Sequence, residues 1–260
     1  SELIDKAELT VSDISGIGIG SPGTIDNKNG VVVYANNLGW YDVPLAAELN
    51  KYINVPVNIE NDANAAAYGE FVECGGDVDS FVAITLGTGV GGGVIIDRKI
   101  YRGFNGAGGE LGHTVLIHGG EPCTCGNDGC WESYASVTAL IRQTKAAIAA
   151  HPESIMAKDE KVSGRTAFNA AKAGDKAGQE VVDKYIEYVA SGITNIINIF
   201  QPNILVIGGG ISKEGDYLLN PIKEYAKKHS YCKAVAQTDI RIASLMNDAG
   251  IIGAALACEQ

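Results

Sequence analysis

The sequence has no long hydrophobic run: none of its 260 residues belongs to an apolar stretch of the roughly 20 residues that a membrane-spanning helix requires. It shows no positively charged start followed by an apolar stretch, the pattern of a secretory signal peptide. Positive charge is scarce, since 20 Lys and Arg oppose 31 Asp and Glu and the formal net charge is −11. Acidic chains repel phosphate backbones and anionic lipid surfaces. We therefore expect a cytoplasmic protein whose main partner is neither a membrane nor a nucleic acid.

Fixed periodicity is also missing. The 33 glycines follow no regular spacing, which excludes a collagen-like chain, and the sequence has no tandem repeat. Residues 1–7 contain no Met and have the pattern of the tail of an amphipathic helix, so we interpret the sequence as a fragment or a processed chain. Hydrophobic residues at 46% and charged residues at 20% are ordinary globular proportions, and the length suits one large or two modest domains.

Strand-like and helical segments alternate along the chain. Helical periodicity dominates the region 137–200, with one interruption at 151–163. Apolar strand patterns end in glycine or Asn-Asp loops, and these strand patterns lie at 14–20, 55–59, 81–86 and 203–207. This alternation predicts an α/β protein. The glycines at 75–76 mark the best domain boundary.

Three of the six cysteines lie close together in a loop that contains glycine. Cys123, Cys125 and Cys130 follow His113 with the spacing His-x9-Cys-x-Cys-x4-Cys. One imidazole and three thiolates form a closed tetrahedral set, which predicts a structural zinc site. The alternative is a disulfide with one odd thiol, which a reducing compartment disfavours. The scattered cysteines are predicted to be buried small hydrophobic residues, and they are Cys74, Cys232 and Cys258.

Two glycine-rich loops follow apolar strands. Gly87-Thr88-Gly89 offers backbone N–H groups and a hydroxyl, which suit a phosphate. Gly208-Gly209-Gly210 leads toward a helix and could admit a nucleoside or a phosphate. The first loop is not a Walker loop, because no Gly-Lys-Ser/Thr ends it. A tight turn is the alternative interpretation of both.

Three carboxylates occupy positions that favour chemistry. Asn61-Asp62 follows a strand and opens a helix, so Asp62 is a candidate general base, with a simple helix cap as the alternative. Glu110 and Glu132 flank the predicted zinc ligands. Because carboxylates accept paired hydrogen bonds from vicinal hydroxyls, we predict a polyol ligand there. Solvated loop acids are the alternative.

Together these segments resemble the signature of the ROK family (repressors, open reading frames and sugar kinases). The resemblance is strongest at 110–113 and 123–136 and extends to 20–26, 37–40, 60–64 and both glycine loops. It covers almost the whole chain, and within the family it is closest to the bacterial ATP-dependent glucokinases. It implies the actin-like ATPase (ribonuclease H-like) fold of sugar kinases, with two α/β domains and a cleft between them.

The resemblance also implies roles for individual residues. Asp62 matches the catalytic base of the family. The sugar ligands match Asn61, Asp62, Glu110, His113 and Glu132, and the zinc ligands match His113, Cys123, Cys125 and Cys130. The second phosphate loop matches Gly87, Thr88 and Gly89, and the adenosine loop matches Gly208, Gly209 and Gly210. The implied partners are a hexose, foremost glucose, and ATP with Mg²⁺, and the implied assembly is a homodimer or a homotetramer.

One family feature is absent from the sequence. Family kinases begin with a strand and an Asp-x-Gly-Gly-Thr loop that holds phosphate and Mg²⁺, and no segment of the sequence matches it. We therefore expect a small first domain, the remnant 1–78 with 247–260, to be incomplete beside a large α/β domain of 79–246 that carries the zinc loop. We expect the chain as given to be an inactive part of a kinase. The alternative is a sugar-sensing ROK-type transcriptional repressor without its DNA-binding domain.

Overall fold

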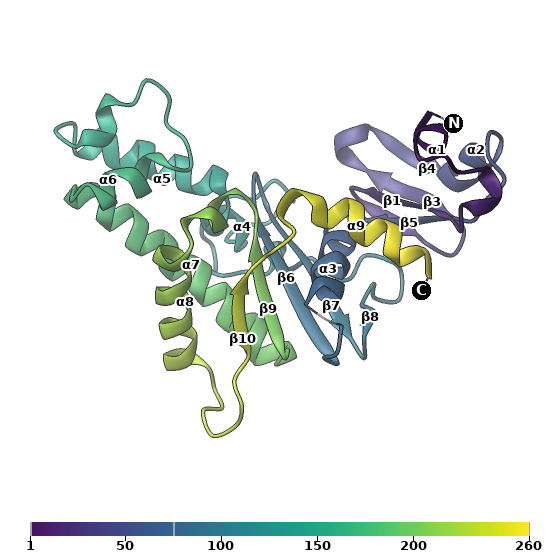
Figure 1. Ribbon diagram of the computed structural model, residues 1–260. Helices are drawn as coiled ribbons and strands as arrows, with labels where there is room; N and C mark the ends of the chain where they lie inside the picture. Colours follow the sequence, from purple (N-terminus) through teal and green to yellow (C-terminus); the bar gives the residue numbers. More distant parts are fainter. Residues whose placement is uncertain (1, 75, 260) are drawn as a thin grey trace. The chain divides into compact units, whose positions relative to one another are not determined.

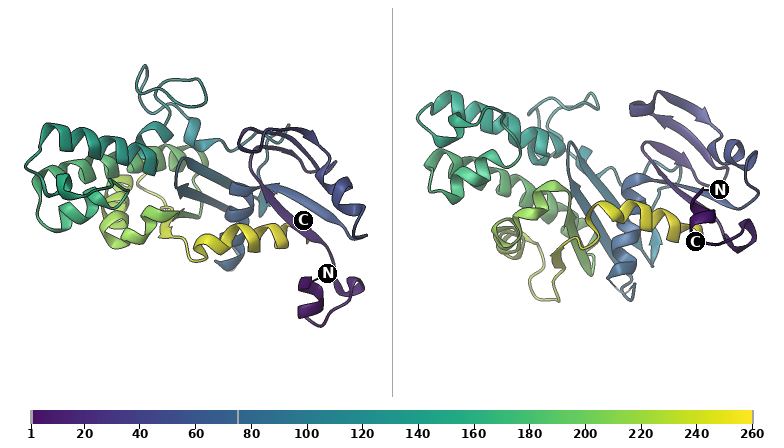
Figure 2. Two further views of the ribbon diagram at one scale, coloured as in Figure 1. Left: turned by 90° about the horizontal axis from the view of Figure 1, so that it is seen from above. Right: turned by 45° about the horizontal axis from the view of Figure 1, so that its top comes forward.

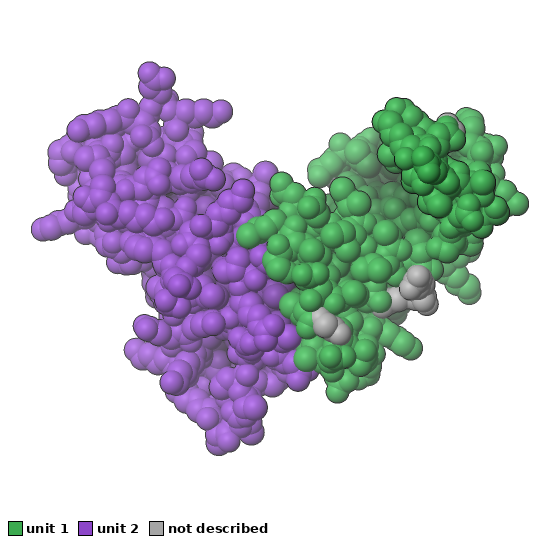
Figure 3. Space-filling view, in the orientation of Figure 1, with its two compact units in different colours: residues 1–83, 93–109, 244–260 green, residues 84–92, 110–243 purple. Residues whose placement is uncertain are grey.

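The computed structural model describes residues 2–74 and 76–259. Strands and helices alternate along the chain, which confirms the α/β class (Figure 1). The chain divides into two compact units (Figure 3): unit 1 comprises 1–83, 93–109 and 244–260, and unit 2 comprises 84–92 and 110–243. The two units group residues that contact one another. The domain boundaries near 78 and 246 stay a prediction.

Unit 1 contains two small sheets. β1 (Ile17–Ser21) pairs in parallel with β5 (Val57–Asn61). An antiparallel sheet has the order β2 (Thr24–Asp26), β3 (Val31–Ala35) and β4 (Trp40–Val43). Its buried side chains form a small core with Ile59 of β5. The packing of Ile59 in this core holds the end of β5 in place. The strand ends at Asn61, directly before the candidate base Asp62.

Among the described residues, four α-helices belong to unit 1. They are α1 (Glu2–Lys6), α2 (Leu45–Asn50), α3 (Asp62–Glu73) and, from the end of the chain, α9 (Ala249–Leu256). α3 and α9 pack through small residues, because a Cβ on Gly253 would lie 1.7 Å from the carbonyl oxygen of Ala65. A Cβ on Gly18 of β1 would likewise overlap the backbone of α9. Only glycine permits such backbone contacts, so α3 is held closely in this unit.

The longest sheet has the strand order β10-β9-β6-β7-β8. β9 (Ile204–Gly208) and β10 (Asp239–Ile242) pair in parallel, and β7 (Val90–Ile96) and β8 (Lys99–Ile100) pair antiparallel. β6 (Ser80–Leu86) is a near-continuous apolar strand. The division between the units passes through β6 and β7.

The helices of unit 2 are α4 (Glu132–Ala135), α5 (Val137–Ala150), α6 (Thr166–Lys172), α7 (Lys176–Phe200) and α8 (Asp216–His229). α5, α6 and α8 pack along α7 (Figure 2). The sequence predicts one interruption of the helical region 137–200, whereas the structure has two, because α6 and α7 are also separate helices. The Asp175 carboxylate accepts a hydrogen bond from the N–H of Gly178 and starts α7 there. Gly174, with a φ of +85°, precedes this cap, and a glycine followed by an aspartate is a local signal of such a break.

Large aromatic side chains contribute to the core of unit 2. Trp131, Phe168 and Tyr185 are almost completely buried. The indole N–H of Trp131 donates to the carbonyl of Tyr188 at 2.9 Å, and a Cβ on Gly192 would collide with the indole ring. Trp131 thereby anchors the end of the cysteine loop on α7. Among the described residues, no helix has the length and apolar character to cross a membrane.

Candidate functional site

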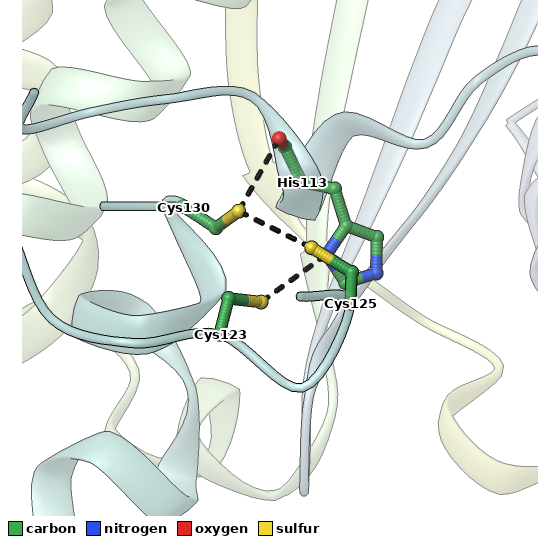
Figure 4. A group of neighbouring side chains, drawn as sticks. All are labelled: His113, Cys123, Cys125 and Cys130. Carbon is green, nitrogen blue, oxygen red and sulfur yellow. Dashed lines mark hydrogen bonds between the residues drawn. The ribbon is translucent and has the colours of Figure 1, made fainter. Parts of the chain in front are cut away.

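Four potential metal ligands converge in unit 2 (Figure 4). His113 Nδ1 lies 3.5 Å from Cys123 Sγ, and the Sγ atoms of Cys125 and Cys130 lie 3.6 Å apart. All four ligand atoms lie within 4.8 Å of one another. Tetrahedral zinc with Zn–S bonds of about 2.3 Å places its sulfur ligands ~3.8 Å apart. The four residues therefore fit a zinc ion, whereas a disulfide requires sulfur atoms only about 2.05 Å apart.

Two glycines shape the cysteine loop. Gly126 and Gly129 have φ angles of +89° and +80°, in the region that side chains disfavour. A Cβ on Gly129 would lie 1.7 Å from the carbonyl oxygen of Ile117. The N–H of Cys123 donates to the carbonyl of Asn127 at 2.8 Å, which closes the turn. The loop thus reverses its direction tightly enough for its thiols to meet His113.

The thiols differ in burial and in acidity. Burial is the main cause that raises the pKa of the Cys130 thiol, and the neighbouring Cys123 and Cys125 add to it. Burial also opposes ionisation of Cys123, but hydrogen bonds from Cys125 and His113 outweigh it and lower the pKa of Cys123. A metal ion binds thiolates, so it would displace the remaining thiol protons.

Glu132 connects the cysteine loop with the first glycine loop. One of its carboxylate oxygens lies 4.0 Å from Cys123 Sγ, and the other accepts a hydrogen bond from the N–H of Val90 at 2.9 Å. A Cβ on Gly89 would lie 2.2 Å from that second oxygen. Glycine at this position therefore makes room for the Glu132 carboxylate.

The start of α5 holds the 87–89 loop from another side. The N–H of Val137 donates to the carbonyl of Gly87 at 2.8 Å, and the hydroxyl of Thr138 donates to the carbonyl of Thr88 at 2.7 Å. The N–H of Gly87 donates to the carbonyl of Gly89, and that of Val90 is bonded to Glu132. Because the N–H groups of Gly87 and Val90 are already hydrogen-bonded, the predicted phosphate contacts are limited to Gly89 and to Thr88, which is exposed.

The second glycine loop follows β9. Gly209 has a φ of +88°, and a Cβ there would lie 2.2 Å from the carbonyl oxygen of Leu86. Close backbone packing thus explains this glycine without a ligand. Gly210 begins the 3-10 helix η5 (Gly210–Glu214) and is exposed, and a Cβ there would meet no atom within 4 Å. Gly208 is buried, so the prediction of an adenosine contact depends on Gly210.

Asn61, not Asp62, caps α3. The Asn61 side-chain oxygen accepts hydrogen bonds from the N–H groups of Ala63 at 3.0 Å and Asn64 at 3.2 Å. Its amide group donates to the carbonyl of Gly23 at 3.1 Å. Asp62 occupies the first helical position with an exposed side chain, although one of its oxygens also accepts from the N–H of Ala63. The carboxylate is thus presented to solvent where the helix begins.

The remaining predicted residues are placed as follows. Glu110 is exposed and starts the second segment of unit 2, and its carbonyl accepts from the N–H of His113 at 3.1 Å. Asn61 and Asp62 belong to unit 1, and the other candidates belong to unit 2. The predicted burial of the scattered cysteines is wrong, because Cys232 is exposed and Cys74 and Cys258 are only partly buried.

Glu60 has no role among the sequence predictions, yet its side chain is only 1% exposed. Its carboxylate pairs with Arg102, 42 residues away, and with Asn27, 33 residues away. No local pattern indicates contacts over such separations. The only signal in the sequence is an acidic residue directly after a strand pattern and directly before Asn61.

Comparison with known proteins places the chain among sugar kinases and their relatives. A family model described as the ROK family matches residues 1–260. The glucokinase of Halalkalibacterium halodurans is 43% identical over 248 residues, which are 93% of this chain and 75% of that protein. The xylose repressor of Caldicellulosiruptor bescii is 35% identical over 255 residues, which are 96% of this chain and 64% of that protein.

A solved structure resembles the whole chain. It is a ROK family glucokinase from Streptomyces griseus in complex with glucose and AMPPNP. Its TM-score is 0.82 at 33% identity, and the match covers 100% of this chain and 88% of that one. The chain therefore has the actin-like ATPase fold of these sugar kinases.

Proposed function

Because the chain belongs to the ROK family, we propose that this protein is an ATP-dependent hexose kinase that converts glucose to glucose 6-phosphate. The observation that carries this proposal is the exposed Asp62 carboxylate at the start of α3, beside a separate cap at Asn61. A hexose hydroxyl is a poor nucleophile because it stays protonated near neutral pH. A carboxylate within reach can take its proton as the bond to phosphorus forms, which typically contributes about 10²–10⁴-fold.

The proposed sugar ligands of unit 2 are Glu110, His113 and Glu132. An imidazole has two nitrogens, so His113 can direct Nδ1 to a metal ion and Nε2 to a sugar hydroxyl. Glu132 uses one oxygen for the N–H of Val90, and its other lone pairs can accept from hydroxyls. Asn61 adds an amide in unit 1.

We assign a structural zinc ion to His113, Cys123, Cys125 and Cys130. Four protein ligands leave no position for a substrate, so the ion would act by fixing His113 and the chain that leads to Glu132. Reduced thiolates and ATP are both available in the cytoplasm, which is where we place the activity. ATP with Mg²⁺ would contact the 87–89 and 208–210 loops, and positioning and charge neutralisation would supply most of the remaining catalysis.

A coupled assay of ADP release on the full-length protein tests the kinase. We expect turnover with glucose, ATP and Mg²⁺, and phosphate on the sugar's 6-oxygen by NMR. Xylose is the matched control, because its pyranose ring has the same hydroxyls but no 6-hydroxymethyl group. Absence of turnover with glucose, mannose, fructose and N-acetylglucosamine would refute the proposal.

A sugar-responsive repressor is the second candidate, since a xylose repressor matches nearly the whole chain. Sugar binding by calorimetry without turnover, together with salt-sensitive binding to duplex DNA by the full-length protein, would favour it. From the family resemblance alone we also propose an assembly of two or four copies, which sedimentation equilibrium measures.

A further inference from the structure

Glu60 joins three segments of unit 1 that are distant in the sequence. One carboxylate oxygen accepts hydrogen bonds from the N–H of Asn61 at 3.0 Å and from the side-chain amide of Asn64 at 3.2 Å. The other accepts from Nε and Nη2 of Arg102 at 2.8 and 2.6 Å, and from the amide of Asn27 at 3.2 Å. Five donors thus surround one buried carboxylate.

This donor set requires an anion. Arg102 can only donate, and two of its nitrogens lie 2.8 and 2.6 Å from one Glu60 oxygen, which are the short distances of charge-assisted pairs. A neutral amide at position 60 would turn an NH₂ group toward at least one donor. Buried ion pairs contribute little net stability compared with apolar packing. Orientation of the attached segments is therefore the better explanation for this one.

One of the segments that Glu60 joins carries the candidate base. Asn61 and Asn64 flank Asp62 on either side, and Asn61 caps the helix that Asp62 begins. Arg102 stands at the base of the loop 103–109, where its carbonyl accepts from the N–H of Gly108 at 2.9 Å. That loop ends where the chain leaves unit 1.

We propose that Glu60 is a positioning residue for Asp62. By binding the N–H of Asn61 and the side chain of Asn64, it holds the helix cap in place and so fixes the direction of the Asp62 carboxylate. Arg102 and Asn27 keep Glu60 itself in one conformation. This inference rests on the proposed function of Asp62 as the base.

The test compares Glu60→Gln with Glu70→Gln in the full-length protein. Glu70 is a matched control, because it lies on α3, the helix that Asp62 begins, is likewise buried at 2% exposed, and accepts hydrogen bonds from the N–H groups of Ser244 and Leu245 at 2.9 and 2.8 Å. Misplacing a catalytic group by an ångström costs about 100-fold in rate. We expect Glu60→Gln to lower kcat to this degree, with the KM for glucose changed within about threefold, and Glu70→Gln to keep kcat.

The kinetic measurements are made at a temperature at which circular dichroism shows that both variants are folded. Arg102→Lys is the second variant. Arg102 is partly exposed, so the protein should tolerate a change there, and lysine keeps the positive charge but cannot contact Glu60 through two nitrogens. It should lower kcat in the same direction even if Glu60→Gln does not fold. Unchanged kcat in the folded Glu60→Gln variant, or in Arg102→Lys when Glu60→Gln fails to fold, would overturn the proposal. So would an equal loss in Glu70→Gln.

Hydrogen exchange separates this inference from the proposed function. The amides of Ala63 and Asn64 bind the Asn61 side chain, so they should exchange faster in Glu60→Gln and in Arg102→Lys than in the unaltered protein. If the unaltered protein has no kinase activity, the proposed function fails, but this exchange still reports whether Glu60 positions the cap. Unchanged exchange at both amides in these variants refutes the positioning role.

Discussion

The cysteine loop of unit 2 and the start of α3 in unit 1 are held in place in different ways. The four potential metal ligands lie within 17 residues of one another, and a large buried aromatic residue, Trp131, anchors the end of the loop. The start of α3 depends instead on Glu60, whose partners lie up to 42 residues away, and on a helix contact made by Gly253. A metal ion would hold the first region through local chain segments, whereas the second needs the folded unit.

This difference has a practical consequence. Damage to the metal ligands should be detected as lost metal and lost stability in unit 2. Damage to the Gly253 contact should leave the metal content intact. Each region can therefore be altered while the other serves as its reference.

Removal of the metal should have the largest effect. We expect about one zinc per chain in the full-length protein, because structural zinc binding in small domains is worth roughly 10 kcal/mol. Cys125→Ala should lose the metal and lower the melting temperature, measured by elemental analysis and calorimetry. Cys232→Ala, at an exposed position, is the control and should keep both. Freshly purified, unchelated protein without zinc would contradict the assignment.

Replacement of the candidate base should have the next largest effect. Asp62→Asn keeps the size of the side chain but removes the proton acceptor, so turnover should fall by about 10²–10⁴-fold. Glucose affinity by calorimetry should change much less, as expected for a residue that acts in the transition state. Asp183→Asn, on the exposed face of α7, is the control. A variant at position 62 that retains turnover within a few-fold would show that the carboxylate is not the base.

The contact between α3 and α9 can be tested within one helix. Gly253→Ala would place a methyl group 1.7 Å from the backbone of Ala65, whereas Gly250→Ala meets no atom within 4 Å. The first should lower the free energy of unfolding by about 1–3 kcal/mol or more, and the second should raise it by up to about 1 kcal/mol through helix propensity. Urea denaturation measures both, and zinc content should stay unchanged. Equal stabilities would show that α9 is not packed this closely.

The helix cap of α5 should give the smallest effect. The Ser136 hydroxyl accepts a hydrogen bond from the N–H of Ala139 at 3.1 Å, and Ser136→Ala should cost about 1 kcal/mol. Because the next residue, Val137, binds the carbonyl of Gly87, the KM for ATP should rise slightly as well. Thermal denaturation and steady-state kinetics measure the two effects. Ser136→Gly, which adds no atoms to this buried site, should keep most of the stability, because glycine is well tolerated at a helix N-cap.

The alternation of strands and helices could be predicted from the sequence, because hydrophobic periodicity and glycine loops are local properties. The break between α6 and α7 was missed, although Gly174, with a φ of +85°, and the capping residue Asp175 are local signals of a helix end and a helix start. The sequence also left open whether Asp62 was a cap or a candidate base. The structure assigns the cap to Asn61, a choice between neighbours that depends on backbone conformation.

The spacing of His113 and the three cysteines, by itself, determined which residues could hold a metal ion, because a short chain with glycine turns can bring such ligands together in few ways. Only the tertiary structure showed that Glu60 lies among donors from three segments, and that Gly253 lies against the backbone of α3. The physical reason is range: ligands a few residues apart are constrained by the chain that joins them, whereas partners tens of residues apart meet only after strands and helices have packed.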